Sequence, residues 1–153
     1  VTKGRKELVK GEYRISTHIW IMDSNGRILV LKRSEQEDKF PGMWAQVGGG
    51  VVAGDTSKET VINECLEELG LTVLPEELSL IYSERNDEKK SFYDLFYLQN
   101  DYDISKMNLQ KEEVEDVKWL SEDEVRALCS NNNFKISHIE AFEIIMNKIK
   151  ERE

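Results

Sequence analysis

The sequence predicts an α/β fold in which a mixed β-sheet carries helices on both faces. Segments with alternating apolar residues, typical of strands, flank one strongly amphipathic helix at about residues 57–69. A second helical pattern, over residues 136–152, closes the chain. The 153 residues are enough for one sizeable core, and neither a repeat nor a linker composition divides them. We therefore expect one domain over residues 1–153.

The predicted strands follow one another in the order of the chain. Residues 13–22 alternate, and a turn at residues 24–26 joins them to a second strand at residues 27–32. A short strand at residues 45–47 leads into a run of glycines. A hairpin follows at residues 78–84 and 92–99, with its tip at residues 85–90, and then a last strand at residues 114–120. Ser121 begins a short helix with a capping pattern, and residues 131–133 join it to the last helix.

The helix at residues 57–69 has sequence signals at both ends. Thr56 and Glu59 have the capping-box spacing, and Gly70 suits the C-terminal stop. At about 100° per residue, apolar and acidic residues separate onto adjacent arcs of the helix. The apolar arc contains Val61, Ile62, Cys65, Leu66 and Leu69, and the acidic arc contains Glu64, Glu67 and Glu68.

Composition excludes several classes of function. A net charge of −9 argues against general binding to a nucleic-acid backbone, which needs clustered Lys and Arg. No apolar run approaches the roughly 18 residues of a membrane span, and the first residues do not resemble a signal peptide. Cys65 and Cys129 fit no close-spaced zinc or redox motif. We expect a cytoplasmic protein with reduced thiols, and the sequence leaves a monomer and a homodimer both open.

The acidic arc has two interpretations. In a chain this acidic, three glutamates on one helix face are often simply solvated, and each like-charge pair costs a few tenths of a kcal/mol. However, residues 48–50 are all glycine, and we expect them to form a loop whose backbone carbonyls can approach a bound ion closely. Mg²⁺ prefers carboxylate and carbonyl oxygens and is often completed by substrate phosphates. The combination favours a site for Mg²⁺ or Mn²⁺.

Residues 49–71 resemble the signature of the Nudix hydrolases. That signature is Gly, five residues, Glu, seven residues, and then Arg-Glu-aliphatic-any-Glu-Glu-any-Gly-aliphatic. Cys65 occupies the first aliphatic position as a small hydrophobe. Asp55 replaces the first Glu and Asn63 replaces the Arg, so a buttressing ion pair of the family is reduced to at best a neutral hydrogen bond. The matching positions are Gly49, Glu64, Glu67, Glu68, Gly70 and Leu71.

The resemblance implies a Nudix-type α/β/α sandwich and a specific chemistry. The expected reaction is Mg²⁺-dependent hydrolysis of the diphosphate linkage in a nucleoside diphosphate derivative or a related organic diphosphate. The small-molecule diphosphate is the expected partner. The implied metal ligands are the Gly49 carbonyl, Glu64, Glu67 and Glu68, and the three glutamates are the expected catalytic residues. The general base stays open between Glu64 and one of Glu112, Glu113 and Glu115.

Three residues ahead of the signature are candidates for binding substrate. Arg33 ends a strand, and in the family an Arg at this place often reaches a substrate phosphate, which its fork binds bidentately. Phe40 and Trp44 bracket a Pro-Gly pair and are placed to stack on a flat group, although core packing explains them equally well. His18 lies among inward-facing strand residues, where we expect a core histidine with its hydrogen bonds satisfied.

Two alternatives remain. The stretch from Gly11 to Gly49 is also similar to isopentenyl diphosphate isomerases, with Trp20 and Arg33 among the shared residues. Those enzymes use a catalytic Cys just before the metal loop and several His ligands, whereas residues 44–47 here contain no Cys and the chain has two His. The departure at Asn63 also allows a Nudix domain that binds its ligand without turnover.

Overall fold

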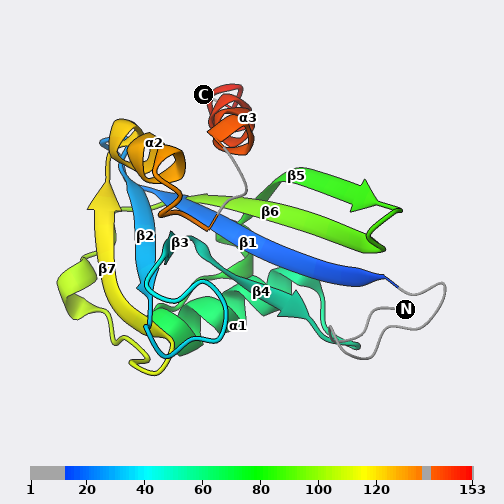
Figure 1. Cartoon of the computed structure of the whole chain (residues 1–153), viewed down its shortest axis with the longest axis horizontal. Helices are drawn as coiled ribbons and strands as arrows, with labels where there is room; N and C mark the ends of the chain where they lie inside the picture. The colour runs from blue at the N-terminus through cyan, green and yellow to red at the C-terminus, as the bar shows by residue number, and fades with distance from the viewer. Residues whose placement is uncertain (1–12, 136–138, 153) are drawn as a thin grey trace.

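A computed structural model describes residues 13–135 and 139–152. Its centre is a seven-stranded mixed sheet around β1 (Arg14–Met22) (Figure 1). β6 (Ser91–Gln99) runs parallel to β1 along its whole length and occupies one of its two edges. β2 (Ile28–Arg33) and β4 (Val47–Val51) therefore share the other edge. β2 pairs with the end of β1 at Met22, and β4 pairs with residues 15–19.

The other strands extend the sheet on both sides. β5 (Ser79–Asn86) pairs with β6 as an antiparallel hairpin, and β3 (Trp44–Ala45) and β7 (Val114–Leu120) both pair antiparallel with β2. Two 3₁₀ turns, Pro75–Glu77 and Ile104–Lys106, interrupt the connections. The topology brings β4, the end of β2 and the start of β7 to the same side of β1.

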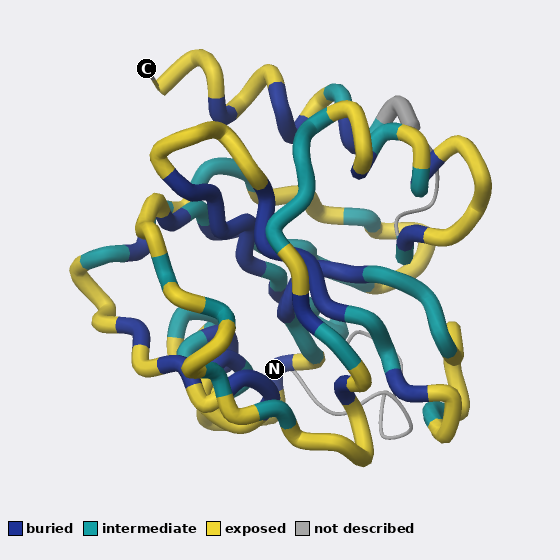
Figure 2. The backbone as a smooth tube through the Cα atoms, turned by 90° about the vertical axis from the view of Figure 1, so that its left-hand side faces the viewer, coloured by how far each residue is buried: buried dark blue, intermediate teal, exposed yellow. Residues whose placement is uncertain are grey.

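Helices cover both faces of the sheet. α1 (Ser57–Leu69) lies on one face, and α2 (Glu122–Ser130) and α3 (Ile139–Lys150) lie on the other (Figure 1). One apolar cluster joins α1 to the sheet, and a second one, around Trp20, Phe134 and Phe142, lies beneath α2 and α3. Buried backbone accordingly runs through the middle of the molecule, with exposed segments on both sides (Figure 2). The predicted fold class is confirmed.

Local signals located several elements correctly. α1 and β7 have the predicted limits, and the other strands differ from prediction by one to four residues at their ends. The Thr56 side chain accepts a hydrogen bond from the Glu59 backbone N–H, and Gly70 ends α1 at φ 65°. In the last helix, the predicted residues 136–138 lie outside the described part of the chain. None of the described helices is long and apolar enough to cross a membrane.

Two expectations about the signature segment are wrong. The glycines do not form a loop, because Gly48, Gly49 and Gly50 pair with β1 as part of β4. Backbone hydrogen bonds to a neighbouring strand outweigh the weak β-preference of glycine. Leu66 does not join the core and is 53% exposed. The buried arc of α1 is narrower than the arc of its apolar residues.

Candidate active site

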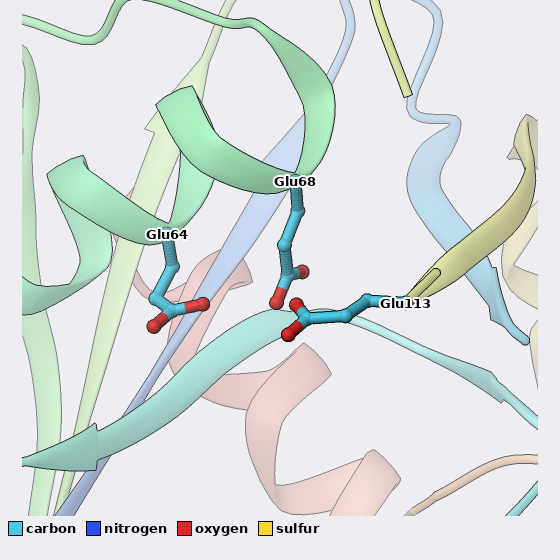
Figure 3. Close-up of side chains that lie close together, drawn as sticks. All are labelled: Glu64, Glu68 and Glu113. Carbon is cyan, nitrogen blue, oxygen red and sulfur yellow. The ribbon is translucent and has the colours of Figure 1, made fainter. Parts of the chain in front are cut away.

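Three carboxylates converge between α1 and the start of β7. Glu64 and Glu68 project from successive turns of α1 toward Glu113, and all three side chains point to one spot beside β4 (Figure 3). One carboxylate oxygen from each lies within 4.8 Å of the others. We call Glu64, Glu68 and Glu113 the carboxylate cluster. Glu68 is only 9% exposed, so part of the cluster is removed from water.

Backbone hydrogen bonds bring Glu113 to α1. The Gln110 N–H donates to the Glu68 carbonyl at 3.0 Å, and the Asn108 N–H donates to the Leu69 carbonyl at 2.9 Å. A turn then follows in which the Glu113 N–H donates to the Gln110 carbonyl at 2.9 Å. Orphan carbonyls at the end of a helix need such partners. The capping of α1 by this loop therefore also delivers the third carboxylate.

Without a bound cation, ionising all three carboxyl groups of the cluster costs free energy. Burial, together with the charges of Glu64 and Glu113, raises the pKa of Glu68 to about 9. Burial and the charges of Glu67 and Glu113 raise the pKa of Glu64, and burial raises that of Glu113. Carboxylates that share a small volume cannot all ionise unless a positive charge compensates them. The metal-free protein thus retains protons here at neutral pH.

Gly49 leaves the space that Glu64 occupies. A Cβ built on Gly49 would lie 3.1 Å from Glu64 Oε1 and 3.2 Å from its Cδ, which is tighter than ordinary van der Waals contact. Side chains alternate across a strand, so Gly49 faces the cluster while Gly48 and Gly50 face the opposite side of β4. The glycine at this position is explained by close approach to a functional carboxylate.

The structure separates the other predicted acidic residues from the cluster. Glu67 is exposed and lies outside it, although its charge affects the pKa of Glu64 and Glu113. Glu115 instead forms an ion pair with Lys32, with a distance of 3.0 Å between Nζ and Oε2. Glu112 is also exposed. Of Glu112, Glu113 and Glu115, only Glu113, directly before β7, joins the carboxylate cluster with α1.

Arg33 lies between the cluster and a neighbouring cavity. Its guanidinium donates two hydrogen bonds to the Lys39 carbonyl, at 3.1 and 2.8 Å, and lies 3.5 Å from a Glu37 carboxylate oxygen. Its charge opposes the rise in pKa of both Glu68 and Glu113. Arg33 is thus held by the 34–43 loop at a place where its charge still acts on Glu68 and Glu113.

The two predicted aromatic candidates occupy different environments. Phe40 is 47% exposed, has a φ of 51° and lines a cavity of about 870 Å³, which we call the Phe40 hollow. Trp44 packs against the core cluster around Trp20, and it does not line the Phe40 hollow. Core packing therefore accounts for Trp44. The Phe40 hollow is lined by Arg14, Arg33, Glu37, Asp38, Lys39, Phe40 and Lys135.

The family's buttress is not replaced by a direct contact. In the described part of the chain, the side chains of Asp55 and Asn63 are both exposed, and no hydrogen bond or ion pair joins them. The cluster is nonetheless assembled, since α1 is fixed by its caps and by the loop before Glu113. Neither of the chain's cysteines lies in the cluster, because both Cys65 and Cys129 are buried in the core.

Comparison with known proteins identifies the family. The model of the NUDIX domain matches residues 12–142. The chain belongs to the Nudix hydrolase family. Nudix hydrolases generally act on nucleoside diphosphate derivatives with the help of divalent metals, and the signature alignment inferred from the sequence is consistent with this membership.

Similar Nudix proteins include an uncharacterised hydrolase and several solved structures. The chain is 29% identical over 130 residues to the Nudix hydrolase lmo0368 of Listeria monocytogenes, covering 84% of this chain and 76% of that protein. DR0079 from Deinococcus radiodurans has a TM-score of 0.71 at 20% identity, covering 89% and 88% of the two chains. The NUDIX domain of Shewanella oneidensis NrtR, solved with ADP ribose, has a TM-score of 0.67 at 18% identity, covering 94% and 90%. These structures support the Nudix fold of the chain.

Proposed function

We propose that this Nudix enzyme is a Mg²⁺-dependent hydrolase that cleaves the diphosphate linkage of a nucleoside diphosphate derivative or a related organic diphosphate. The observation that carries this proposal is the carboxylate cluster, Glu64, Glu68 and Glu113, with oxygens within 4.8 Å of one another. Hard oxygen ligands and a surplus of negative charge suit Mg²⁺ or Mn²⁺.

In the proposal, the cluster and the Gly49 carbonyl hold the cation. Glu67, which directly precedes Glu68 on α1, remains a candidate ligand through an intervening water, since Mg²⁺ usually keeps several waters. A bound Mg²⁺ supplies charge neutralisation for the diphosphate oxygens and activation of a water for attack on phosphorus. Glu64, Glu67 and Glu68 are the proposed catalytic residues, and Glu113 joins them.

The protein's own groups then orient the substrate and move the proton. Arg33 places a positive charge between the cluster and the Phe40 hollow, where it binds a phosphate oxygen. The exposed ring of Phe40 offers a flat apolar surface for a base or another planar group. The raised pKa values of Glu64 and Glu113 suit a general base, and Glu113 is the more exposed of the two.

The experiment is a substrate panel with a metal control. ADP-ribose, nucleotide sugars, dinucleoside polyphosphates, nucleoside triphosphates and prenyl diphosphates are incubated with the protein and Mg²⁺, and the products are resolved by chromatography. We expect cleavage of at least one diphosphate, which stops in excess chelator and returns with added Mg²⁺ or Mn²⁺. Isomerisation of a prenyl diphosphate, or binding without any turnover, would contradict the proposal.

A further inference from the structure

A second cavity lies on the face of β4 opposite the carboxylate cluster. It measures about 590 Å³, and we call it the Gly50 hollow. A Cβ built on Gly50 would meet no described residue within 4 Å, so the described part of the chain leaves space beside this glycine. The hollow adjoins the Phe40 hollow, because Arg14 and Lys135 line both. It is lined by Arg14, Ile15, Ser16, His18, Gly49, Gly50, Val51, Val52, Lys89, Ser91 and Lys135.

The Gly50 hollow is strongly basic in an acidic protein. Three cationic side chains, from Arg14, Lys89 and Lys135, line it, and none of its described lining residues is acidic. The cations come from β1, from the tip of the β5–β6 hairpin and from the segment after α2. Neither Arg14 nor Lys89 forms an ion pair with a residue in the described part of the chain. Arg14 and Lys89, two neighbouring cations with no carboxylate partner among the described residues, point to an anionic ligand.

His18 supplies independent evidence about this hollow. Its Nδ1 is buried and has no hydrogen-bond partner among the described residues, which contradicts the expected satisfied core histidine. Burial and the charge of Lys135 lower the pKa of His18 to about 3, so the ring stays neutral. The ring also explains Gly48, since a Cβ there would lie 2.2 Å from His18 Cδ2. A neutral imidazole, together with the Ser16 and Ser91 hydroxyls, adds hydrogen-bonding groups to the three cations.

We propose that the Gly50 hollow is a subsite for a second anionic group of the substrate, a phosphate in addition to the diphosphate that is cleaved. This inference rests on the proposed function, which it deepens by naming the substrate class as a diphosphate whose attached group is itself phosphorylated. The diphosphate lies at the carboxylate cluster and Arg33, and the attached group passes over β4 into the hollow. Arg14 binds the extra phosphate bidentately, and Lys89 adds a further positive charge.

Matched pairs of ligands test the subsite. Each pair shares a diphosphate and differs by one phosphate, as in ADP-ribose with its 2′-phosphate and dephospho-coenzyme A with coenzyme A. We expect at least one pair to show a preference of about tenfold or more in kcat/KM for the phosphorylated member, the scale of one charge-assisted contact. Isothermal titration calorimetry in excess chelator measures the same preference as a ratio of affinities, without turnover.

Variants connect the preference to the hollow. Lys89→Gln and Arg14→Gln should each reduce it by roughly tenfold. Gly50→Val, whose Cβ would meet no described residue within 4 Å, places apolar atoms in the hollow and should reduce the preference without a change of charge. Lys106→Gln is the matched control, because Lys106 is exposed, lines neither hollow and loses the same charge. Circular dichroism reports whether each variant folds.

The outcomes separate the two proposals. Preference for a phosphorylated ligand that disappears in the hollow variants and persists in Lys106→Gln supports the subsite. Absence of preference in every pair, or preference retained in Lys89→Gln, Arg14→Gln and Gly50→Val, overturns it. If no diphosphate is hydrolysed, the proposed function fails, while the calorimetric ratios still decide whether the hollow recognises a phosphate.

Discussion

Replacing Glu68 with Gln should remove activity and stabilise the metal-free protein. The substitution keeps the shape of the side chain but removes the charge that burial and two neighbouring carboxylates oppose. In the presence of Mg²⁺, turnover should fall by at least about 10²-fold, the scale seen when one preorganised electrostatic partner is lost. In excess chelator, the free energy of unfolding should rise.

The magnitude of that rise follows from the pKa of Glu68. The folded, metal-free protein has a pKa of about 9 at this position, against an ordinary value of 4.5. Because the folded state binds the proton more tightly, stability falls as pH rises from the lower value to the higher one. The cost is about 1.4 kcal/mol per pH unit, which gives an upper bound of about 4 kcal/mol near pH 7.5. Gln avoids this cost, and we expect a gain of about 1–4 kcal/mol.

Urea unfolding in chelator measures the effect. Wild type and Glu68→Gln are compared near pH 8 and near pH 5, with Glu76→Gln as an exposed control of equal charge change. The variant should be the more stable near pH 8, and the difference should shrink to less than about 1 kcal/mol near pH 5, which is close to the ordinary pKa of 4.5 and well below the folded-state pKa of about 9. Added Mg²⁺ should stabilise the wild type far more than the variant. Equal free energies of unfolding for wild type and variant at both pH values would refute the reasoning, and so would near-normal turnover in the variant.

Three further predictions concern the same region. The affinity for Mg²⁺ should rise by up to about tenfold per pH unit between about pH 6 and 8, because binding releases the proton held at Glu68; a pH-independent affinity in titration calorimetry would contradict this. Gly49→Ala should weaken Mg²⁺ binding at least severalfold with little loss of fold, since its Cβ would lie 3.1 Å from Glu64 Oε1; unchanged affinity would show that Glu64 moves freely. Restoring the family's pair through Asp55→Glu and Asn63→Arg should give a favourable coupling energy of about 0.5–3 kcal/mol in a double-mutant cycle on stability, and strict additivity would show that the two positions do not communicate.

The features that sequence located well are determined by neighbouring residues. Thr56 and Gly70 fix both ends of α1, and its spacing places Glu64 and Glu68 one turn apart on one face. The limits of β7 were also predicted, because alternating residues run up to the Ser121 cap.

The features that sequence missed depend on distant partners. The strand character of the glycines comes from pairing with β1, more than 25 residues earlier in the chain. The sequence offered Glu112, Glu113 and Glu115 without choosing among them. Glu113 reaches the cluster because the turn before it forms hydrogen bonds with the end of α1. Glu115 instead forms an ion pair with Lys32.

The Gly50 hollow lay beyond prediction for the same reason. Arg14, Lys89 and Lys135 are ordinary surface cations in the sequence, separated by tens of residues. The parallel pairing of β1 with β6 brings Arg14 beside Ser91, next to the hairpin tip that carries Lys89. His18 is visible as a core residue from its strand, but its unsatisfied nitrogen follows only from the packing around Gly48.

Manganese binding measured alongside activity tests the central claim most directly. Free Mn²⁺ is followed by electron paramagnetic resonance while hydrolysis of the best substrate is measured at each concentration, in wild type and in Glu68→Gln. If the carboxylate cluster holds the catalytic cation, activity should rise in proportion to the bound metal, and the variant should lose both together. Full activity in excess chelator, or Mn²⁺ binding of wild-type strength in the variant, would contradict the account.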